Sequence, residues 1–343
     1  MVFALPAAVT VLAPATSANL GPGFDSLGLA LQLYNRFEVS EVVDGDPSQP
    51  QIEISGSYGT GLTRGANNLF FRAFAALFQE HGQDLPAVRV RMKINIPPGC
   101  GLGSSATAVV GGLVAAKALL AAYDIEISQD QLLKIAVDLE SGKHPDNVAP
   151  ALLGGLVATT KAGGEVQALK IVFPDALRAV IFTPDFPMDT IAGRKLLPES
   201  YSKADVTFNT GRVALFLTAL QTRRYDLIGE AMQDRLHQPY RQSLFPEMPA
   251  IIEAAIAAGA HGASLSGGGS SLIALASGQF QAVLQAMQEA ASKLGVRGTG
   301  MILRADQQGA RIVNTSRSRV RKEESARNGN QFYWTPARGS STN

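Results

Sequence analysis

The sequence predicts an α+β protein built from two domains. Its 343 residues divide into two units of about 150, the size of a typical domain. A hydrophobic fraction of 46% beside 17% charged residues is typical of a globular chain that buries a large core. Strand and helix periodicities alternate along the first half, and the second half closes on an order of elements that suits helices covering one face of an antiparallel sheet.

The first half starts with a strand and then mixes strands with helices. No Lys or Arg precedes Arg36, so the apolar start lacks the positive region of a secretory signal and predicts a first strand over residues 8–12. Alternating patterns predict further strands over residues 36–43, 51–55 and 88–96. The last of these alternates strictly, which predicts one wet face. Helical spacing of apolar residues predicts helices over 68–79, 105–122 and 129–140.

The second half follows a short strand over residues 156–160. A turn over 162–165 predicts the domain boundary, with one domain over 1–165 and the other over 166–314. Beyond it we expect a strand over 178–182, helices near 205–220, 225–234 and 249–258, and then strand, glycine loop, strand, helix and strand over 262–303. Residues 315–343 hold six basic and two acidic side chains and predict a polar, disordered tail.

Composition excludes several classes of function. A formal net charge of +1 leaves no chain-wide basic field to hold nucleic acid. One cysteine, Cys100, forms no internal disulfide, and four histidines beside a single thiol argue against structural zinc. The longest weakly polar run, 109–122, is too short to cross a bilayer and holds Lys117. The sequence therefore predicts a cytoplasmic protein with no nucleic-acid or membrane partner.

The strongest local signal is a glycine loop over residues 97–106, between a predicted strand and a predicted helix. Its three glycines let the backbone approach a ligand, Ser104 and Ser105 are expected to cap the helix, and free amides at a helix start stabilise an anion such as phosphate. No Lys follows the glycines, so this is no Walker loop. A dinucleotide pattern does match on paper, but a strand alternating with Arg and Lys, followed by two prolines, argues against it.

Two further glycine loops accompany it. Residues 13–25 place Asn19 and Asp25 in a loop held by two prolines and two glycines. Residues 264–271 carry the run Gly267, Gly268 and Gly269 between two short apolar strands. A triple glycine costs conformational entropy on folding, so this loop is either a loose surface turn or a place where the backbone closely approaches a ligand.

In this order the three loops resemble the signature motifs of the galactokinase, homoserine kinase, mevalonate kinase and phosphomevalonate kinase (GHMP) superfamily. The run 140–155, which contains His144, Asp146 and Asn147 in H-x-D-N-V-A-P, resembles the homoserine kinase branch, and the likeness covers residues 9–303. The resemblance implies a two-domain fold. Its nucleotide-binding N-terminal domain is ribosomal-protein-like with a left-handed βαβ unit, and its C-terminal domain is ferredoxin-like.

The resemblance implies ATP-dependent phosphorylation of L-homoserine to O-phospho-L-homoserine, with Mg²⁺. The alternatives are another small-molecule kinase of the superfamily, acting on a mevalonate-like acid or a sugar, and a catalytically silent sensor. The implied metal ligands are Ser105 and Glu140, and Asn68 falls where the family contacts adenine. The residues implied to hold the nucleotide phosphates are Pro97, Gly99, Gly101, Leu102, Gly103, Ser104, Ser105 and Ala106, with Gly267, Gly268 and Gly269.

The homoserine site follows from the same resemblance. Arg194 and Arg241 match carboxylate-binding arginines, and a guanidinium fork suits that group. Asp25 is implied to take the ammonium, helped by Asn19. Around the hydroxyl lie Thr190, His144, Asp146 and Asn147, with Asp146 either a general base or an orienting group. The family also implies a homodimer.

Two of the glycine loops depart from the family pattern. Cys100 stands where many relatives carry a polar or charged residue, and it is expected to fill a turn. In the third loop Gly268, Ser270 and Ser271 replace the usual small residue, proline and threonine, so a looser loop is expected.

Overall fold

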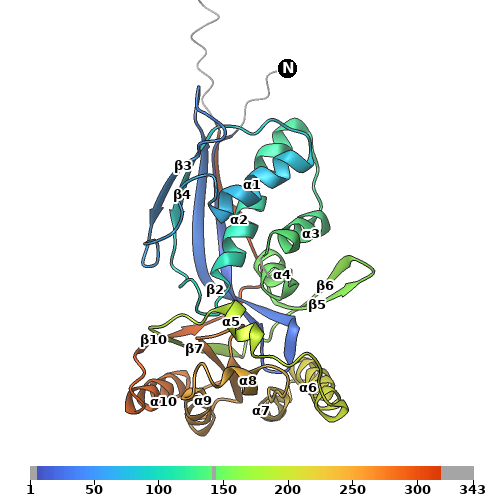
Figure 1. Cartoon of the computed structure of the whole chain (residues 1–343), viewed down its shortest axis with the longest axis vertical. Helices are drawn as coiled ribbons and strands as arrows, with labels where there is room; N and C mark the ends of the chain where they lie inside the picture. The colour runs from blue at the N-terminus through green and yellow to red at the C-terminus, as the bar shows by residue number, and fades with distance from the viewer. Residues whose placement is uncertain (1–5, 141–143, 318–343) are drawn as a thin grey trace, which may run out of the picture.

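A computed structural model describes residues 6–140 and 144–317 of the chain in two parts, one above the other in Figure 1. The upper part holds a seven-stranded sheet in the order β11-β1-β2-β4-β3, with β5 paired to β2 and β6 to β5. Its strands are β1 (Pro6–Asn19), β2 (Gly23–Glu41), β3 (Gln51–Ser55), β4 (Val88–Lys93), β5 (Leu156–Ala162), β6 (Glu165–Ile171) and β11 (Arg311–Arg317).

Helices cover one face of this sheet, and water reaches the other. Figure 1 shows the four helices to the right of the long strands: α1 (Leu69–Glu80), α2 (Ser104–Leu120), α3 (Gln129–Leu139) and α4 (Pro145–Leu153). On the open face Arg91 pairs with Glu38 at 3.1 Å and with Glu53 at 3.2 Å. The solvent-exposed face predicted for the strand over 88–96 is thus confirmed for β4, which ends at Lys93. Helix α1 connects the parallel strands β3 and β4 in a βαβ unit.

Helix α2 is longer than the apolar run seen in the sequence. With the 3₁₀ turn that follows (Ala121–Tyr123), the segment Ser104–Tyr123 has the length and hydropathy of a membrane span. Its most apolar window is 67% buried inside the protein, packed against the sheet and α1, as in the central helix of a globular core.

The lower part has the ferredoxin-like strand order that the resemblance implies. Its sheet runs β10-β7-β9-β8, all antiparallel. The strands are β7 (Arg178–Pro184), β8 (Gly262–Leu265), β9 (Leu272–Ala276) and β10 (Gly298–Leu303). Figure 1 shows helices beneath this sheet, with α5 above it near the upper part. The helices are α5 (Thr190–Lys195), α6 (Lys203–Thr222), α7 (Ile228–Ala231), α8 (Gln238–Arg241), α9 (Met248–Ala257) and α10 (Phe280–Lys293).

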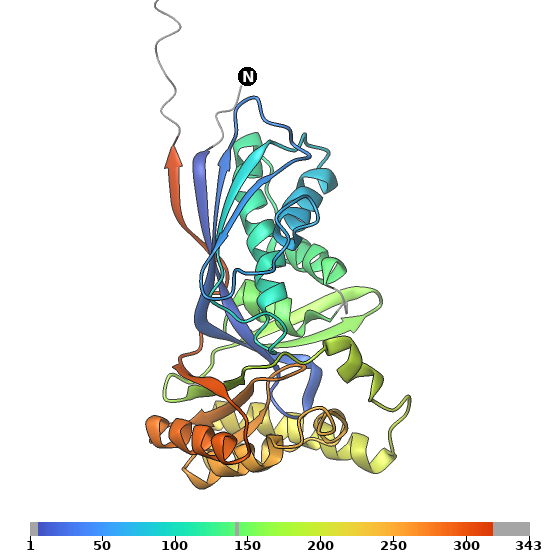
Figure 2. The same ribbon diagram turned by 60° about the vertical axis from the view of Figure 1, so that its left-hand side comes forward.

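The structure moves the domain boundaries. The turn at 162–165 is a hairpin within one sheet, since β5 pairs with β6 from Leu156↔Ile171 to Ala162↔Glu165. The chain therefore enters the lower part only after β6. It also returns, because β11 pairs with β1 at the top of the molecule (Figure 2). Limits of 1–165 and 166–314 are wrong for this reason: strand pairing joins segments far apart in sequence. Of the predicted tail, residues 315–317 belong to β11, and 318–343 lie outside the described residues.

The first glycine loop is mostly strand. β1 continues from Pro6 to Asn19 and β2 begins at Gly23, so only three residues turn between them. The predicted strand over 8–12 and the predicted loop over 13–25 are both corrected. Pro14 is tolerated because β11 pairs with β1 only as far as Leu12, and a register shift follows Pro14 on the β2 side.

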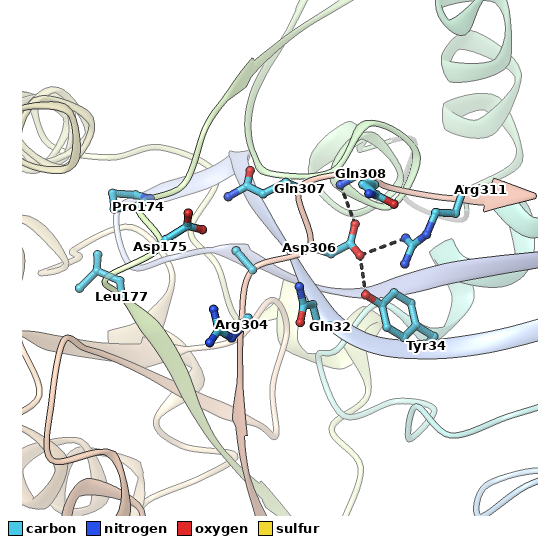
Figure 3. Close-up of a pocket in the computed structure, with 11 residues that line it drawn as sticks. Gln32, Tyr34, Pro174, Asp175, Leu177, Arg304, Asp306, Gln307, Gln308 and Arg311 are labelled. Atoms are coloured by element: carbon cyan, nitrogen blue, oxygen red, sulfur yellow. Dashed lines mark hydrogen bonds and ion pairs between the residues drawn. The ribbon is translucent and has the colours of Figure 1, made fainter. Parts of the chain in front are cut away.

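Asp306 fastens the segment between β10 and β11 to the upper sheet. It is 2% exposed and accepts hydrogen bonds from the Tyr34 hydroxyl at 2.6 Å and the Arg311 guanidinium at 3.1 Å (Figure 3). Backbone amides of Gln308 and Gly309 donate to it at 2.9 and 2.7 Å. The carboxylate thus holds the returning chain against β2.

Asp306→Asn is expected to lower the free energy of unfolding by about 1–3 kcal/mol, the worth of hydrogen bonds to a buried charged group. The asparagine side-chain amide would place an N–H donor against the Tyr34 hydroxyl and the Arg311 guanidinium, which are also donors. Urea unfolding followed by circular dichroism measures this, with Asp175→Asn as the control, because Asp175 is exposed on the far wall of the same pocket (Figure 3). Equal midpoints for the two variants would contradict this role.

Candidate active site

The three glycine loops lie against one another. The Ser266 hydroxyl donates to the Gly101 carbonyl at 2.6 Å and, with its one proton used there, accepts from the Ser17 hydroxyl at 2.8 Å, so one side chain of the third loop joins the other two. The Ser271 amide donates to the Cys100 carbonyl at 2.9 Å. Gly101 has φ +77°, and a Cβ there would overlap the Ser266 carbonyl. Close approach of backbones therefore explains this glycine.

The N-terminus of α2 is open. Its cap is Gly103, in the left-handed conformation with φ 66°, and no side chain of the described residues caps the helix. The expected Ser104 and Ser105 caps are wrong: the Ser104 hydroxyl donates to the Ile96 carbonyl at 3.1 Å, and the Ser105 hydroxyl lies 3.5 Å from Glu140. The first-turn amides thus have neither a helical partner nor a capping side chain, which suits an anion.

Two oxygens meet beside this helix start. Glu140 follows α3 as its C-cap residue, and its Oε1 faces the Ser105 hydroxyl. Its other oxygen, Oε2, is buried without a hydrogen-bond partner within residues 6–140 and 144–317. Burial raises the pKa of Glu140, and the Ser105 hydroxyl opposes that shift. A buried carboxylate oxygen without a partner beside a hydroxyl is a donor set that fits a hard divalent cation.

A cleft of about 370 Å³ opens next to these oxygens. It is lined by Asn19, Asp25, Glu140, His144, Asp146, Asn147, Thr190, Ile191, Arg194, Lys195, Arg241, Gly267 and Gly268. Every residue assigned to the substrate in the sequence is in this wall. The lining residues come from the end of β1, the start of β2, the C-cap of α3, α4 with its N-cap, α5, α8 and the third glycine loop, so both parts of the molecule contribute.

Arg194 and Asp25 pair with each other across the cleft. The guanidinium donates to both carboxylate oxygens, at 2.6 and 3.0 Å, and His144 Nδ1 lies 3.1 Å from the same carboxylate. Burial lowers the pKa of Arg194, but the bond with Asp25 outweighs it and the pKa is raised. Burial lowers the pKa of His144. The imidazole is therefore neutral at pH 7 and contributes polarity rather than charge.

Arg241 holds a positive charge without an acid beside it. It is 2% exposed, and within the described residues no carboxylate reaches ion-pair distance. Its Nη1 donates to the Gly267 carbonyl at 3.1 Å and to His237 Nδ1 at 3.0 Å, while its Nε is buried without a partner. Burial and the neighbouring Arg194 lower its pKa. A buried guanidinium of this kind attracts an anionic ligand.

Asp146 sits at the first turn of α4, which begins at Pro145. It is 4% exposed, and burial, with the charge of Asp25, raises its pKa to about 7. The Asn147 amide lies 3.4 Å from it, and Thr16 donates to the Asn147 oxygen at 2.8 Å, which turns the amide nitrogen toward Asp146. A carboxyl group that titrates near neutrality can accept a proton in a cleft.

Other predicted residues have structural partners. Asn68 caps α1, accepting from the amides of Phe70 and Phe71, and its own amide donates to the Thr63 carbonyl at 2.6 Å. Its contact with adenine stays a prediction. The expectation that the third loop is loose is wrong, since Ser270 and Ser271 are fully buried and the Ser271 hydroxyl is hydrogen-bonded to the Thr183 hydroxyl at 2.8 Å.

Cys100 is a buried turn residue, and three residues outside the predicted set support the site. Cys100 is 8% exposed, as expected for a turn-filling residue, and burial raises the pKa of its thiol. Thr16, Phe24 and His237 support the site, yet only the first two lie in a motif, and no sequence signal singled them out.

The chain is similar to known proteins in both of its parts. The chain matches the GHMP kinases N terminal domain over residues 68–155 and the GHMP kinases C terminal domain over 216–299. It is 42% identical to a homoserine kinase of Microchaete diplosiphon, covering 89% of this chain and 97% of that one. It is 40% identical to a homoserine kinase of Desulfitobacterium hafniense, covering 89% and 100%.

Solved structures agree. The crystal structure of homoserine kinase from Cytophaga hutchinsonii is similar with a TM-score of 0.81 and 28% identity, over 90% of this chain and 98% of that one. A mevalonate kinase of L. major in complex with R-mevalonate has a TM-score of 0.67 at 19% identity, over 87% and 95%. The second likeness concerns the fold alone.

Proposed function

The chain belongs to the GHMP kinase family, and from that premise we propose that the cleft beside α2 is where it transfers a phosphoryl group from ATP to the side-chain hydroxyl of L-homoserine. The chain phosphorylates homoserine, and the product, O-phospho-L-homoserine, lies on the route to threonine. What remains to be assigned is the role of each residue.

The observation that carries the assignment is the set of charges in the cleft. Homoserine is a zwitterion, so its site needs a cation for the carboxylate and an anion for the ammonium. Arg241, which has no acid beside it among the described residues, supplies the first. Asp25 supplies the second, since a carboxylate paired with Arg194 keeps lone pairs for a further donor. A mevalonate-like acid would leave Asp25 without an ammonium, and a sugar would leave both charges unmatched.

The open amides of α2 are proposed to bind the terminal phosphates of ATP. Phosphoryl transfer depends mainly on positioning and on stabilising charge, and the helix dipole adds partial positive charge where the amides point. Gly101 and Gly103 let the loop backbone approach closely, and Gly267 and Gly268 close the cleft from the other part of the molecule. Asp146 is proposed to accept the hydroxyl proton as the new bond to phosphorus forms.

ADP release measures this function. A coupled assay with ATP and, in parallel, L-homoserine, mevalonate and galactose should show release that depends on homoserine. Faster release with mevalonate or galactose would contradict the assignment of the cleft.

Ser105 and Glu140 are proposed to hold Mg²⁺, which when bound neutralises charge on the transferring phosphate. Glu140→Gln is expected to raise the Mg²⁺ concentration for half-maximal activity on the order of 10-fold, because one charged ligand is lost. Its melting temperature should not fall, since the carboxylate is a buried acid with an unpartnered oxygen. Glu126→Gln, at an exposed residue of the same part, is the control. An unchanged Mg²⁺ requirement would contradict the role.

The homodimer implied by the resemblance and the cytoplasmic location predicted from the composition stay predictions. Light scattering at micromolar concentration measures the first, and cell fractionation measures the second.

A further inference from the structure

A fully buried histidine lies directly behind the cleft. His237 precedes α8 and is 0% exposed. Its Nε2 is 2.7 Å from the Gly21 carbonyl, in the turn between β1 and β2, and its Nδ1 is 3.0 Å from Nη1 of Arg241. A carbonyl can only accept and a guanidinium can only donate. The ring therefore carries its proton on Nε2 and offers its Nδ1 lone pair to Arg241.

A buried carboxylate holds this histidine in place. The side chain of Asp234 is 0% exposed and accepts from the backbone amides of Leu236, His237 and Gln238, at 2.9, 2.9 and 2.7 Å. Asn209 of α6 donates to it at 2.8 Å. The turn before α8 is thus rigid. Burial lowers the pKa of His237 although Asp234 opposes that shift, so the neutral form that both ring bonds require is present at pH 7.

An aromatic ring completes the support. Phe24, next to Asp25 in sequence, stacks on the His237 ring with centroids 5.2 Å apart and planes 20° apart. The guanidinium carbons of Arg194 and Arg241 lie 5.3 and 5.5 Å from the centroid of the same phenyl ring. Cations near an aromatic face are attracted to it. One ring therefore contacts both arginines of the cleft and the histidine behind one of them.

We propose that His237 and Phe24 are positioning residues that orient the Arg241 guanidinium toward the homoserine carboxylate. With Nη1 bonded to both His237 and Gly267, the guanidinium cannot turn away from the cleft wall. A buried charged side chain that is already immobile in the free protein loses less conformational freedom when the substrate binds. This inference rests on the proposed function and concerns homoserine affinity, not the transfer step.

The test is a double-mutant cycle with steady-state kinetics. His237→Phe keeps a ring against Phe24 but removes both hydrogen bonds, and it is expected to raise KM for L-homoserine roughly 10-fold, as for a lost hydrogen bond to a charged group. The kcat and KM for ATP should stay within about twofold, because a merely structural defect would alter all three. In an Arg241→Met background the same change should have no further effect, since the residues act as one unit.

Two further variants keep the test decisive. Phe24→Leu leaves the His237 bonds in place and should raise KM for homoserine by a smaller factor. His237→Asn retains an acceptor toward Arg241 and should recover part of the affinity, which matters if His237→Phe does not fold. His261→Phe is the matched control, because that ring bonds to Ser277 outside the cleft, and its kinetics should equal those of the wild type.

The outcomes separate the two proposals. Additive losses in the cycle, or a rise in KM for ATP equal to that for homoserine, would overturn the positioning role. If Arg241→Met itself left KM for homoserine unchanged, the assignment of the carboxylate site under the proposed function would fail instead.

Discussion

Asp146→Asn is expected to lower kcat by about 10²–10⁴-fold, the usual contribution of a general base, with KM for both substrates nearly unchanged. The reason is that burial raises the pKa of this carboxyl to about 7, so its ionised form is basic enough to take a proton from an alcohol as phosphorus bonds to it. In the wild type kcat should rise with pH through about 7 and then level. The variant should lose this dependence.

The same Asp146→Asn substitution that lowers kcat should raise the free energy of unfolding. The carboxyl titrates near 4 when unfolded and about 7 when folded, so the native state binds the proton more tightly, and stability falls as pH rises between these values. The side-chain amide of an asparagine at this position does not ionise, so folding carries no such loss of stability as pH rises. Asp146→Asn should therefore melt higher than the wild type at pH 8 and equally at pH 4, as measured by calorimetry.

Asp138→Asn in α3 is the control, because Asp138 is exposed. If Asp146→Asn lost less than about 10-fold in kcat, the base would be excluded and the carboxylate would serve only to orient Asn147. That result would leave the phosphate itself as the proton acceptor.

Gly103→Ala is expected to lower kcat/KM for ATP by about 10²–10³-fold, the scale seen when a preorganised donor to a developing charge is removed. A Cβ at this position would overlap the Thr16 hydroxyl and come within 3.2 Å of the Asn147 oxygen. The residue is also the cap of α2, so any shift moves the amides proposed to hold the phosphates. ADP release at varied ATP concentrations measures the loss.

Gly61→Ala separates clash from backbone strain. Gly61 also has a positive φ, +80°, but a Cβ there meets nothing within 4 Å. Its variant should cost stability through its φ alone and leave kinetics unchanged. If Gly103→Ala were no less active than Gly61→Ala, the helix start would not be the phosphate site.

Loops were predictable where their chemistry is local. A glycine loop that leads into a helix can be read from neighbours in the chain, and in the structure Gly101 and Gly103 of this loop have φ values of 77° and 66°. Capping failed as a prediction because the αL backbone of Gly103 starts the helix one residue earlier, which leaves the Ser104 hydroxyl to bond Ile96 instead.

Support behind the site could not be read in this way. The bonds that fix Asn147 and His237 join residues 131 and 216 positions apart, Thr16 and Gly21 respectively. Nothing in the local pattern of an isolated histidine distinguishes a buried acceptor for Arg241 from a surface ring. Its role depends on which carbonyl and which guanidinium the fold brings to its two nitrogens.

By itself the amino-acid order determined the reaction class, through the resemblance of its motifs to a known family, and every residue that lines the cleft except Ile191 and Lys195, because each motif is a short run of side chains. Tertiary structure alone decided which of those charges are neutralised: Arg194 is matched by Asp25, whereas Arg241 faces the cleft with no acid beside it in the part of the chain that the structure describes. It also decided that Asp146 is dry enough to titrate near pH 7. Charge pairing and desolvation depend on distances and burial in three dimensions, and these exist only once the two halves of the chain have packed together.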